Sequence, residues 1–124
     1  MIIRYSDEIL RRFNNPKNSG EIKNADGIGI VGSRVCGDVM HLFVKIENNT
    51  ISDIKFKTLG CAAAISFSDA LCDLAKNKSI EQALEIKKND LIKELGGVPN
   101  IKLHCSLLAI EALHKAVEDF KGKK

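Results

Sequence analysis

The sequence predicts an α+β fold in which a three-stranded antiparallel β-meander packs against several α-helices, the last of them long. Between residues 28 and 57, apolar and polar residues alternate with the period of two that is typical of strands with one buried face. On either side of this stretch, apolar residues recur every three or four positions, as in amphipathic helices. The chain has 124 residues, 44% of them hydrophobic, which is enough for one core. We therefore expect a single domain over residues 1–124, with 121–124 as a frayed tail.

The first helix is expected from about residue 6 to residue 13. Ser6 is a favourable N-cap, and Asp7 and Glu8 place negative charge in the first turn, where the helix dipole favours it. Residues 14–20 then end the helix, because proline cannot continue the helical hydrogen bonds and Asn and Gly favour turns.

Three strands follow this turn. The first contains residues 28–33, and the second alternates inward residues with outward ones, Phe43 among the latter. Asn48 and Asn49 tolerate positive φ and predict a tight hairpin into the third strand. We expect one face of this sheet to be bare and helices to cover the other, where the inward side chains lie: Leu42, Val44, Ile46, Ile54 and Phe56.

Four helices are expected in the second half. One begins at Cys61 and ends near residue 76, and a short one begins with the capping box of Ser79 and Gln82. Asn89 or Asp90 is expected to cap the next helix, which ends at two glycines. The last helix follows a proline, and its predicted buried stripe is Leu103, Leu107, Ile110, Leu113, Val117 and Phe120.

Composition excludes two kinds of partner. The net charge is +3 with basic residues scattered along the chain, the aromatic content is 5% and tryptophan is absent, so we expect no nucleic-acid partner. No stretch approaches the roughly 20 apolar residues that span a bilayer, and the first residues do not resemble a secretory signal. We expect a cytoplasmic protein without a membrane partner, whose four cysteines are reduced, metal-bound or reactive.

The chemistry of the chain is concentrated in three short blocks. Cys36 and Asp38 flank Gly37, which lets the backbone bend so that the carboxylate approaches the thiol, and the other blocks contain Cys61 and Cys105. Both of these cysteines fall at predicted helix starts, where unpaired N–H groups favour a thiolate. Soft sulfur and hard oxygen ligands from distant segments predict a metal or iron–sulfur site.

His104 and Lys102 are further candidate site residues, whereas Cys72 is not a candidate. His104 precedes Cys105, but neighbouring helical residues point about 100° apart, so binding through both needs a distorted turn. With five candidate ligands for a four-coordinate site, we hypothesise that ligands exchange. Lys102 is either a solvated charge or a contact to a cluster or partner. Cys72 lies eleven residues beyond Cys61, about 16 Å along a helix, and is predicted to be a core residue.

These blocks carry a family resemblance. Asn15-Pro16-Lys17-Asn18-Ser19-Gly20, Cys36-Gly37-Asp38, Gly60-Cys61-Ala62 and His104-Cys105-Ser106 resemble, in order and separation, the signature blocks of the IscU/NifU N-terminal family of iron–sulfur cluster assembly scaffolds. The resemblance covers nearly the whole chain. It implies the α+β fold already predicted, and a carrier rather than an enzyme.

The resemblance also implies a cofactor and partners. A transient [2Fe-2S] cluster would form on Cys36, Cys61 and Cys105, with Asp38 or His104 completing it, and Zn²⁺ often occupies the apo form. Sulfur would come from a cysteine desulfurase, iron from an iron donor and electrons from a ferredoxin-type reductant, and apo iron–sulfur proteins would accept the cluster. Asp38 would keep the cluster labile.

Three points stay open. Family members served by a dedicated Hsp70-type chaperone carry Leu-Pro-Pro-Val-Lys before His-Cys, whereas this chain has Val98-Pro99-Asn100-Ile101-Lys102, so the chaperone is not assigned. An alternative function is a zinc-bound sulfur acceptor that serves a cysteine desulfurase. A cysteine hydrolase based on Cys105 is disfavoured, because His104 is expected to point away from the thiol and no oxyanion hole is indicated.

Overall fold

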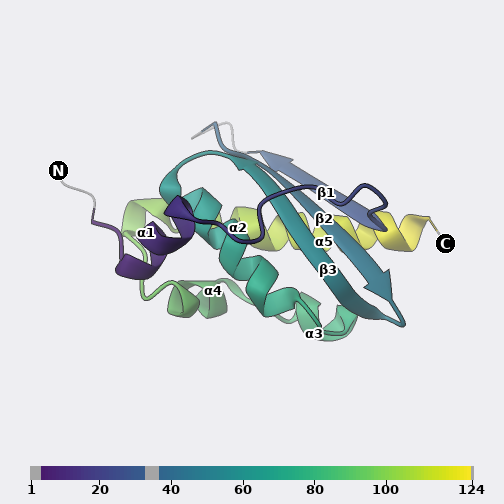
Figure 1. Cartoon of the computed structure of the whole chain (residues 1–124). Coiled ribbons are helices and arrows are strands. Elements are labelled where there is room, and N and C mark those ends of the chain that lie inside the picture. Colours follow the sequence, from purple (N-terminus) through teal and green to yellow (C-terminus); the bar gives the residue numbers. More distant parts are fainter. Residues whose placement is uncertain (1–3, 33–36, 124) are drawn as a thin grey trace.

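The computed structural model describes residues 4–32 and 37–123 of the chain, and Cys36 lies outside the described residues. The elements confirm the α+β class and the predicted order of helices and strands (Figure 1). In chain order they are α1 (Asp7–Asn14), β1 (Gly27–Gly32), β2 (Val39–Glu47), β3 (Thr50–Leu59), α2 (Ala62–Ala75), α3 (Ile80–Leu84), α4 (Lys88–Glu94), the 3-10 helix η1 (Asn100–Lys102) and α5 (His104–Gly122).

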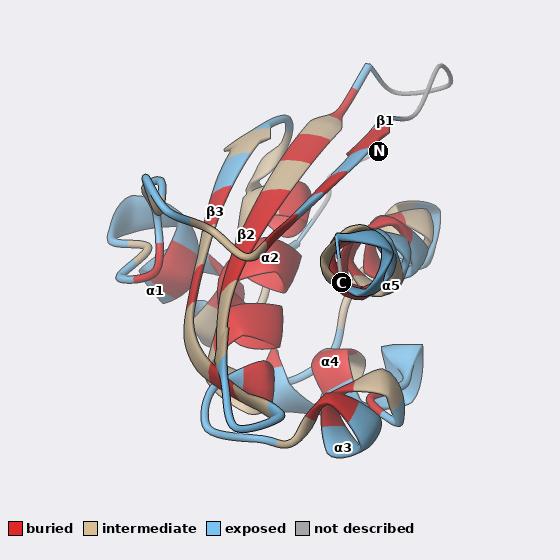
Figure 2. Ribbon diagram, turned by 90° about the vertical axis from the view of Figure 1, so that its right-hand side faces the viewer, coloured by how far each residue is buried: buried red, intermediate tan, exposed pale blue. Residues whose placement is uncertain are grey.

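The sheet has the order β1-β2-β3 with both pairs antiparallel, as a meander requires. Asn48 and Asn49 have φ of 51° and 61° and form the predicted tight turn between β2 and β3. Helices α2 and α5 pack on the same face of the sheet, and the buried residues gather between the sheet and these helices (Figure 2). The hydrophobic core is centred on this interface and also includes buried residues of α1, α3 and α4.

The opposite face of the sheet was expected to be bare, but the chain between α1 and β1 crosses it (Figure 1). The amide of Gly20 donates to the carbonyl of Phe56 in β3, at 2.9 Å, and the amide of Asp26 donates to the carbonyl of Val44 in β2, at 2.8 Å. Residues 21–26 thus run across the strands from β3 towards β1. Phe43, expected to face outward into solvent, is buried. The expectation was wrong because alternation shows only which face of the sheet a residue lies on. It does not show that residues 21–26, which have no periodic pattern, cover that face.

Helix α5 lies unusually close to β1. Gly27 and Gly29 face the helix, and a Cβ atom at either position would overlap a backbone carbonyl oxygen, that of Ala116 or of Ala112. Only a helix face made of small residues can approach a strand this closely. The residues of α5 that meet the two glycines are accordingly Ala112 and Ala116. The other buried residues of the helix are Cys105, Ser106, Leu108, Ala109, Leu113 and Val117.

This contact corrects the predicted stripe of the last helix. Leu103 and Leu107, expected in the core, are 36% and 56% exposed. The aliphatic stripe was chosen by hydrophobicity alone, but the helix presents its alanines to the glycines of β1 and so turns the larger leucines near its start towards solvent.

A buried arginine fixes α1 to α2. Arg12 is 3% exposed, and its guanidinium donates to Asp69 at 2.8 Å and to Asp73 at 2.7 Å. The backbone amide of Asn18 also donates to Asp69, at 3.0 Å, which adds the turn after α1 to the same network. Burial alone would raise the pKa of Asp73, but the hydrogen bonds from Arg12 and Asn18 outweigh it and hold that pKa below its usual value. The sequence alone does not predict this network, because the partners of Arg12 lie 57 and 61 residues away.

The short helices follow the sequence signals with one exception. The capping box of Ser79 and Gln82 begins α3 as predicted. The N-cap of α4 is Lys87 rather than Asn89 or Asp90, because the Asp90 carboxylate reaches back three residues and accepts from the Lys87 amide at 2.8 Å. Among the described residues, no helix is long and apolar enough to cross a membrane.

The glycine contact predicts the effect of one added methyl group. Gly29→Ala should lower the free energy of unfolding by about 2–3 kcal/mol, because the Cβ overlaps backbone that cannot rotate away. Gly32→Ala, in the same strand but with its nearest neighbour at 3.6 Å, should change it by less than about 1 kcal/mol. Urea unfolding of the two variants checks this, and equal stabilities would show that α5 does not need the glycine.

The Arg12 network predicts a contrast between neighbouring arginines. Arg12→Met leaves the carboxylates of Asp69 and Asp73 without their cation and should cost about 3–5 kcal/mol of folding free energy. Arg11→Met, at an exposed position paired with Glu8, should leave stability nearly unchanged. Because the pKa of Asp73 is lowered in the folded protein, its carboxylate should add to the free energy of unfolding of the wild type at neutral pH. This contribution should be lost as acid protonates the carboxylate. Denaturant melts of both variants at neutral and acid pH measure these effects.

Candidate metal centre

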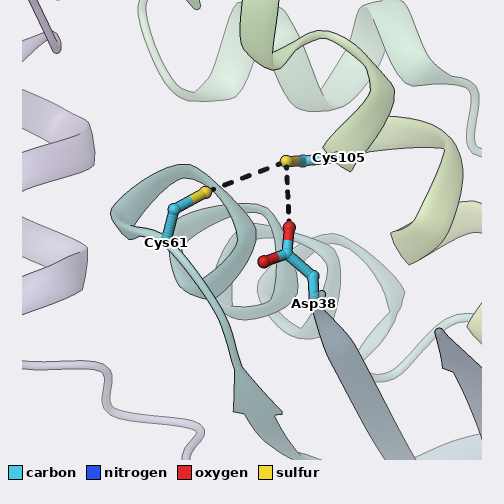
Figure 3. Close-up of side chains that lie close together, drawn as sticks. All are labelled: Asp38, Cys61 and Cys105. Atoms are coloured by element: carbon cyan, nitrogen blue, oxygen red, sulfur yellow. Dashed lines mark hydrogen bonds between the residues drawn. The ribbon is translucent and has the colours of Figure 1, made fainter. Parts of the chain in front are cut away.

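Three side chains from separate elements converge at one end of the sheet (Figure 3). Asp38 directly precedes β2, Cys61 directly precedes α2, and Cys105 lies in the first turn of α5. The start of β2 and the end of β3 share this end of the sheet because the two strands are antiparallel. Helix α5 begins here as well, since it runs antiparallel to β1, with Ala116 at Gly27 and Ala112 at Gly29. One ligand atom from each of the three residues lies within 4.8 Å of the other two.

The spacing of these atoms suits a metal ion. Sγ of Cys105 lies 4.0 Å from Sγ of Cys61 and 3.7 Å from Oδ2 of Asp38. Two ligands of a tetrahedral metal, each about 2.3 Å from it, are about 3.8 Å apart. Two thiols and a carboxylate are therefore already near the separations that one tetrahedral ion requires.

Two glycines make room for Asp38. Gly37 has φ of 71°, the conformation predicted to turn the carboxylate towards the thiols. A Cβ atom on Gly60 would lie 2.6 Å from Oδ1 of Asp38, so this position is limited to glycine by close approach. Asp38 is thus held in a buried slot between β2 and the start of α2, with its Oδ2 directed at Cys105.

Cys61 is the N-cap of α2, where its sulfur accepts a hydrogen bond from the amide of Ala64 at 3.5 Å. The hydrogen bond from Cys105 is the main cause that lowers the pKa of Cys61 to about 5, against the opposing effect of burial, and the Ala64 amide contributes. Cys61 is therefore a thiolate at neutral pH, as its place at a helix start predicted.

His104 lies closer to the thiols than expected. Its Nε2 is 3.6 Å from Sγ of Cys105, so the expectation that the ring points away from its neighbour was wrong. The 100° rule describes the directions of Cα–Cβ bonds, whereas the imidazole has two further rotatable bonds and turns back to the sulfur. His104 borders the group of Asp38, Cys61 and Cys105 on the Cys105 side.

Two more charged or polar groups lie within electrostatic reach of Cys61. The charge of the Cys61 thiolate is the main cause that raises the pKa of Lys102, and burial followed by the same thiolate raises the pKa of Tyr5. Lys102 was a candidate from the sequence, but Tyr5 was missed. The available signal was weak: Tyr5 is the chain's only tyrosine and precedes the Ser6 N-cap of α1.

Of the other two cysteines, Cys72 lies in the core and Cys36 lies outside the described residues. Cys72 is completely buried in α2, burial raises the pKa of its thiol well above the usual value, and it is a core residue as predicted. Cys36 lies outside the described residues, so its place in the candidate site stays a sequence-based prediction.

Fold and site together define a small α+β protein that can hold a metal between thiols and a carboxylate at the open end of its sheet. Comparison with known proteins identifies the family to which it belongs. The chain belongs to the family described as NifU-like N terminal domain, whose model matches residues 4–124.

Individual relatives agree with this family. The chain is 49% identical over 119 residues to iron-sulfur cluster assembly scaffold protein IscU 1 of Archaeoglobus fulgidus, covering 96% of this chain and 78% of that one. It is 40% identical over 126 residues to the scaffold protein IscU of Aquifex aeolicus, covering 100% and 80%. Its fold matches the crystal structure of a nitrogen-fixing NifU-like protein (N-terminal) from Brucella abortus with a TM-score of 0.79, at 16% identity and with 95% and 94% covered.

The lowered pKa of Cys61 predicts how alkylation depends on pH. Because only the thiolate reacts with iodoacetamide, the Cys61 rate in the folded protein should reach half its maximum near pH 5. Cys105→Ala removes the hydrogen-bond donor that is the strongest cause of the lowered pKa and should move this midpoint to higher pH. Peptide mass spectrometry follows the modification of Cys61, and protein unfolded in urea, with a midpoint at about pH 8.5, is the reference. A folded-state midpoint equal to the reference would contradict the arrangement.

Proposed function

We propose that this protein is a scaffold on which an iron–sulfur cluster is assembled and from which it is passed to acceptor proteins. The observation that carries the proposal is the convergence of Asp38, Cys61 and Cys105 within 4.8 Å in a member of the NifU-like N terminal domain family. Relatives of this family with 40–49% identity are named as scaffolds of this kind. The protein acts as a carrier of the cluster rather than as an enzyme.

The proposed cargo is a [2Fe-2S] cluster held by Cys36, Cys61 and Cys105, with Asp38 or His104 as the fourth ligand. The sulfurs of Cys61 and Cys105 are 4.0 Å apart, and both alternatives for the fourth ligand touch Cys105, with Oδ2 of Asp38 at 3.7 Å and Nε2 of His104 at 3.6 Å. Such an arrangement supports exchange between the two, as the surplus of candidate ligands suggested.

Asp38 also gives a physical reason for release. A carboxylate is a hard ligand among soft thiolates, so it adds less stability to an iron–sulfur cluster than a fourth thiolate would. Transfer to an acceptor then needs only a partner that supplies its own thiolates.

The proposed partners are a cysteine desulfurase, an iron donor, a ferredoxin-type reductant and apo iron–sulfur proteins. Exposed apolar side chains surround the site end and offer docking surface: Leu59, Ile101 and Leu107 are 75%, 54% and 56% exposed. A dedicated chaperone stays unassigned, because residues 98–102 lack the second proline. We further propose that the chain works as one domain in the cytoplasm, where a reducing environment keeps its thiols free.

A second candidate is a zinc-bound sulfur acceptor of a cysteine desulfurase. The specific observation in its favour is that the separations among Asp38, Cys61 and Cys105 suit a single tetrahedral ion. In this function Zn²⁺ would stay bound and a cysteine would carry sulfur without any cluster being formed.

Anaerobic reconstitution distinguishes the two functions. With a cysteine desulfurase, cysteine and ferrous iron, the scaffold should develop a visible-absorbing chromophore and transfer it to an apo-ferredoxin. Cys61→Ser should lose the chromophore, whereas Cys72→Ala, in the core outside the site, should keep it. Asp38→Cys should form a cluster and release it more slowly, because a fourth thiolate binds the cluster more tightly than the carboxylate does. Tightly held zinc, no chromophore and faster desulfurase turnover would instead establish the sulfur acceptor.

A further inference from the structure

Residues 15–20 form the first of the four sequence blocks, yet they contain none of the candidate metal ligands. Within this block, Asn18 is buried, with 7% of its surface exposed. Its backbone amide and its side-chain Nδ2 both donate to Oδ1 of Asp69 in α2, each at 3.0 Å. Nδ2 also donates to the backbone carbonyl of Asp69 at 3.2 Å and to Oδ1 of Asp73 at 3.1 Å. Asn18 is therefore fixed to the middle of α2.

The same block is bonded to the outer edge of β3. Strand β2 occupies one edge of β3, and Ser19 forms a parallel bridge with Phe56 on the other. The amide of Phe56 donates to the carbonyl of Asn18 at 3.1 Å, and the amide of Gly20 donates to the carbonyl of Phe56 at 2.9 Å. Both bonds join main-chain groups, so they fix the backbone itself. Residues 18–20 thus connect β3 directly to α2.

The two attachment points lie on either side of Cys61, which is at the junction where β3 ends and α2 begins. Phe56 is three residues from the end of the strand, a length of about 10 Å at about 3.3 Å per residue. Asp69 is seven residues from the first residue of the helix, also about 10 Å at about 1.5 Å per residue. Strand and helix are thus two arms of similar length, and residues 18–20 join their far ends. The resulting closed triangle fixes the angle between β3 and α2.

This angle sets the geometry of the metal centre. Asp38 directly precedes β2 and moves with the sheet, whereas Cys61 is the N-cap of α2 and moves with the helix. A rotation of α2 by about 6° about its attachment at Asp69 would move Cys61 by about 1 Å, whereas a functional site must be held to within about 0.5 Å. The hydrogen bond between Thr58 and Ser68, at 2.7 Å, also ties strand to helix. It joins their facing sides, whereas the block joins them at the edge of the sheet, so the two ties resist different rotations.

We propose that Asn18 is a positioning residue for the metal centre. By bracing β3 against α2, it holds Cys61 at the distance from the other two described ligands that a bound metal requires. The proposal rests on the proposed function, because it concerns the same site, but it requires only that the site bind a metal. Asparagine suits this task because its side chain donates hydrogen bonds without carrying charge. An aspartate of the same shape would place a third carboxylate against Asp69 and Asp73.

Cobalt binding tests the positioning role, because the absorption of bound Co²⁺ reports both thiolate ligands and tetrahedral geometry. Metal-free wild-type protein should give an intense tetrahedral spectrum when it is titrated with Co²⁺. Asn18→Ala removes the side-chain bonds to α2 and should bind Co²⁺ about tenfold more weakly, as is typical when a group that orients a metal ligand is lost. Its tetrahedral bands should also weaken. Asn18→Ser keeps a donor beside Asp69 and should lie between the two, and it replaces Asn18→Ala in the comparison if that variant does not fold.

Ser79→Ala is the matched control. It removes the capping box of α3 and so lowers stability, but it does so at the opposite end of β3, where Ser79 bridges Thr50. This variant should keep the cobalt spectrum and affinity of the wild type. Urea unfolding confirms that each variant is folded under the conditions of the titration.

The outcomes separate the positioning role from the scaffold function. Equal cobalt binding by Asn18→Ala and Ser79→Ala would overturn the positioning role and leave the scaffold function standing. A selective loss in Asn18→Ala, in a protein that builds no cluster on anaerobic reconstitution, would support the positioning role and overturn the scaffold function. A wild-type protein that binds no Co²⁺ would overturn both.

Discussion

The contact between α5 and β1 is the constraint on which the arrangement of the site depends. Gly27 and Gly29 let the helix backbone lie directly against the strand, and its buried face carries alanines to match. Side chains of ordinary size at the two glycines would separate the helix from the sheet and displace its first turn. Because α5 runs antiparallel to β1, this turn lies at the sheet end where β2 starts and β3 ends. The packing of two small-residue surfaces thereby brings Cys105 to Cys61 and Asp38.

The second thiol depends on a different anchor. Helix α2 carries Cys61 at its N-cap and is held on one side by the core and on the other by Arg12, whose guanidinium binds Asp69 and Asp73. The site thus combines rigid positions with unequal ligands: a thiolate at a helix start, a buried thiol and a carboxylate fitted against Gly60. Rigid placement favours binding of a metal or cluster, whereas the hard carboxylate weakens it, and a carrier needs both.

Much of the fold could be predicted because its signals are local. Alternation identified the strands, Asn48 and Asn49 identified the hairpin, and the capping box of Ser79 and Gln82 identified α3. The predictions that failed concern contacts with distant segments. Phe43 is buried because residues 21–26 cross the sheet, and Leu107 is exposed because alanines of α5 face β1. From the sequence, Arg12 is expected to be a solvent-exposed charge on an amphipathic helix. It is buried because it pairs with Asp69 and Asp73, which lie 57 and 61 residues away in the chain.

The sequence by itself determined which residues carry the chemistry. Cysteines at helix starts, and an aspartate beside a glycine, are local patterns whose effect on thiolate character and backbone bending is also local. Only the tertiary structure decided how these groups meet: that Asp38 and Cys105 touch, that His104 turns back to its neighbour, that Tyr5 and Lys102 lie within reach of Cys61, and that one thiol is accessible while the other is enclosed. Distances and burial depend on packing between segments far apart in the chain, which no local pattern records.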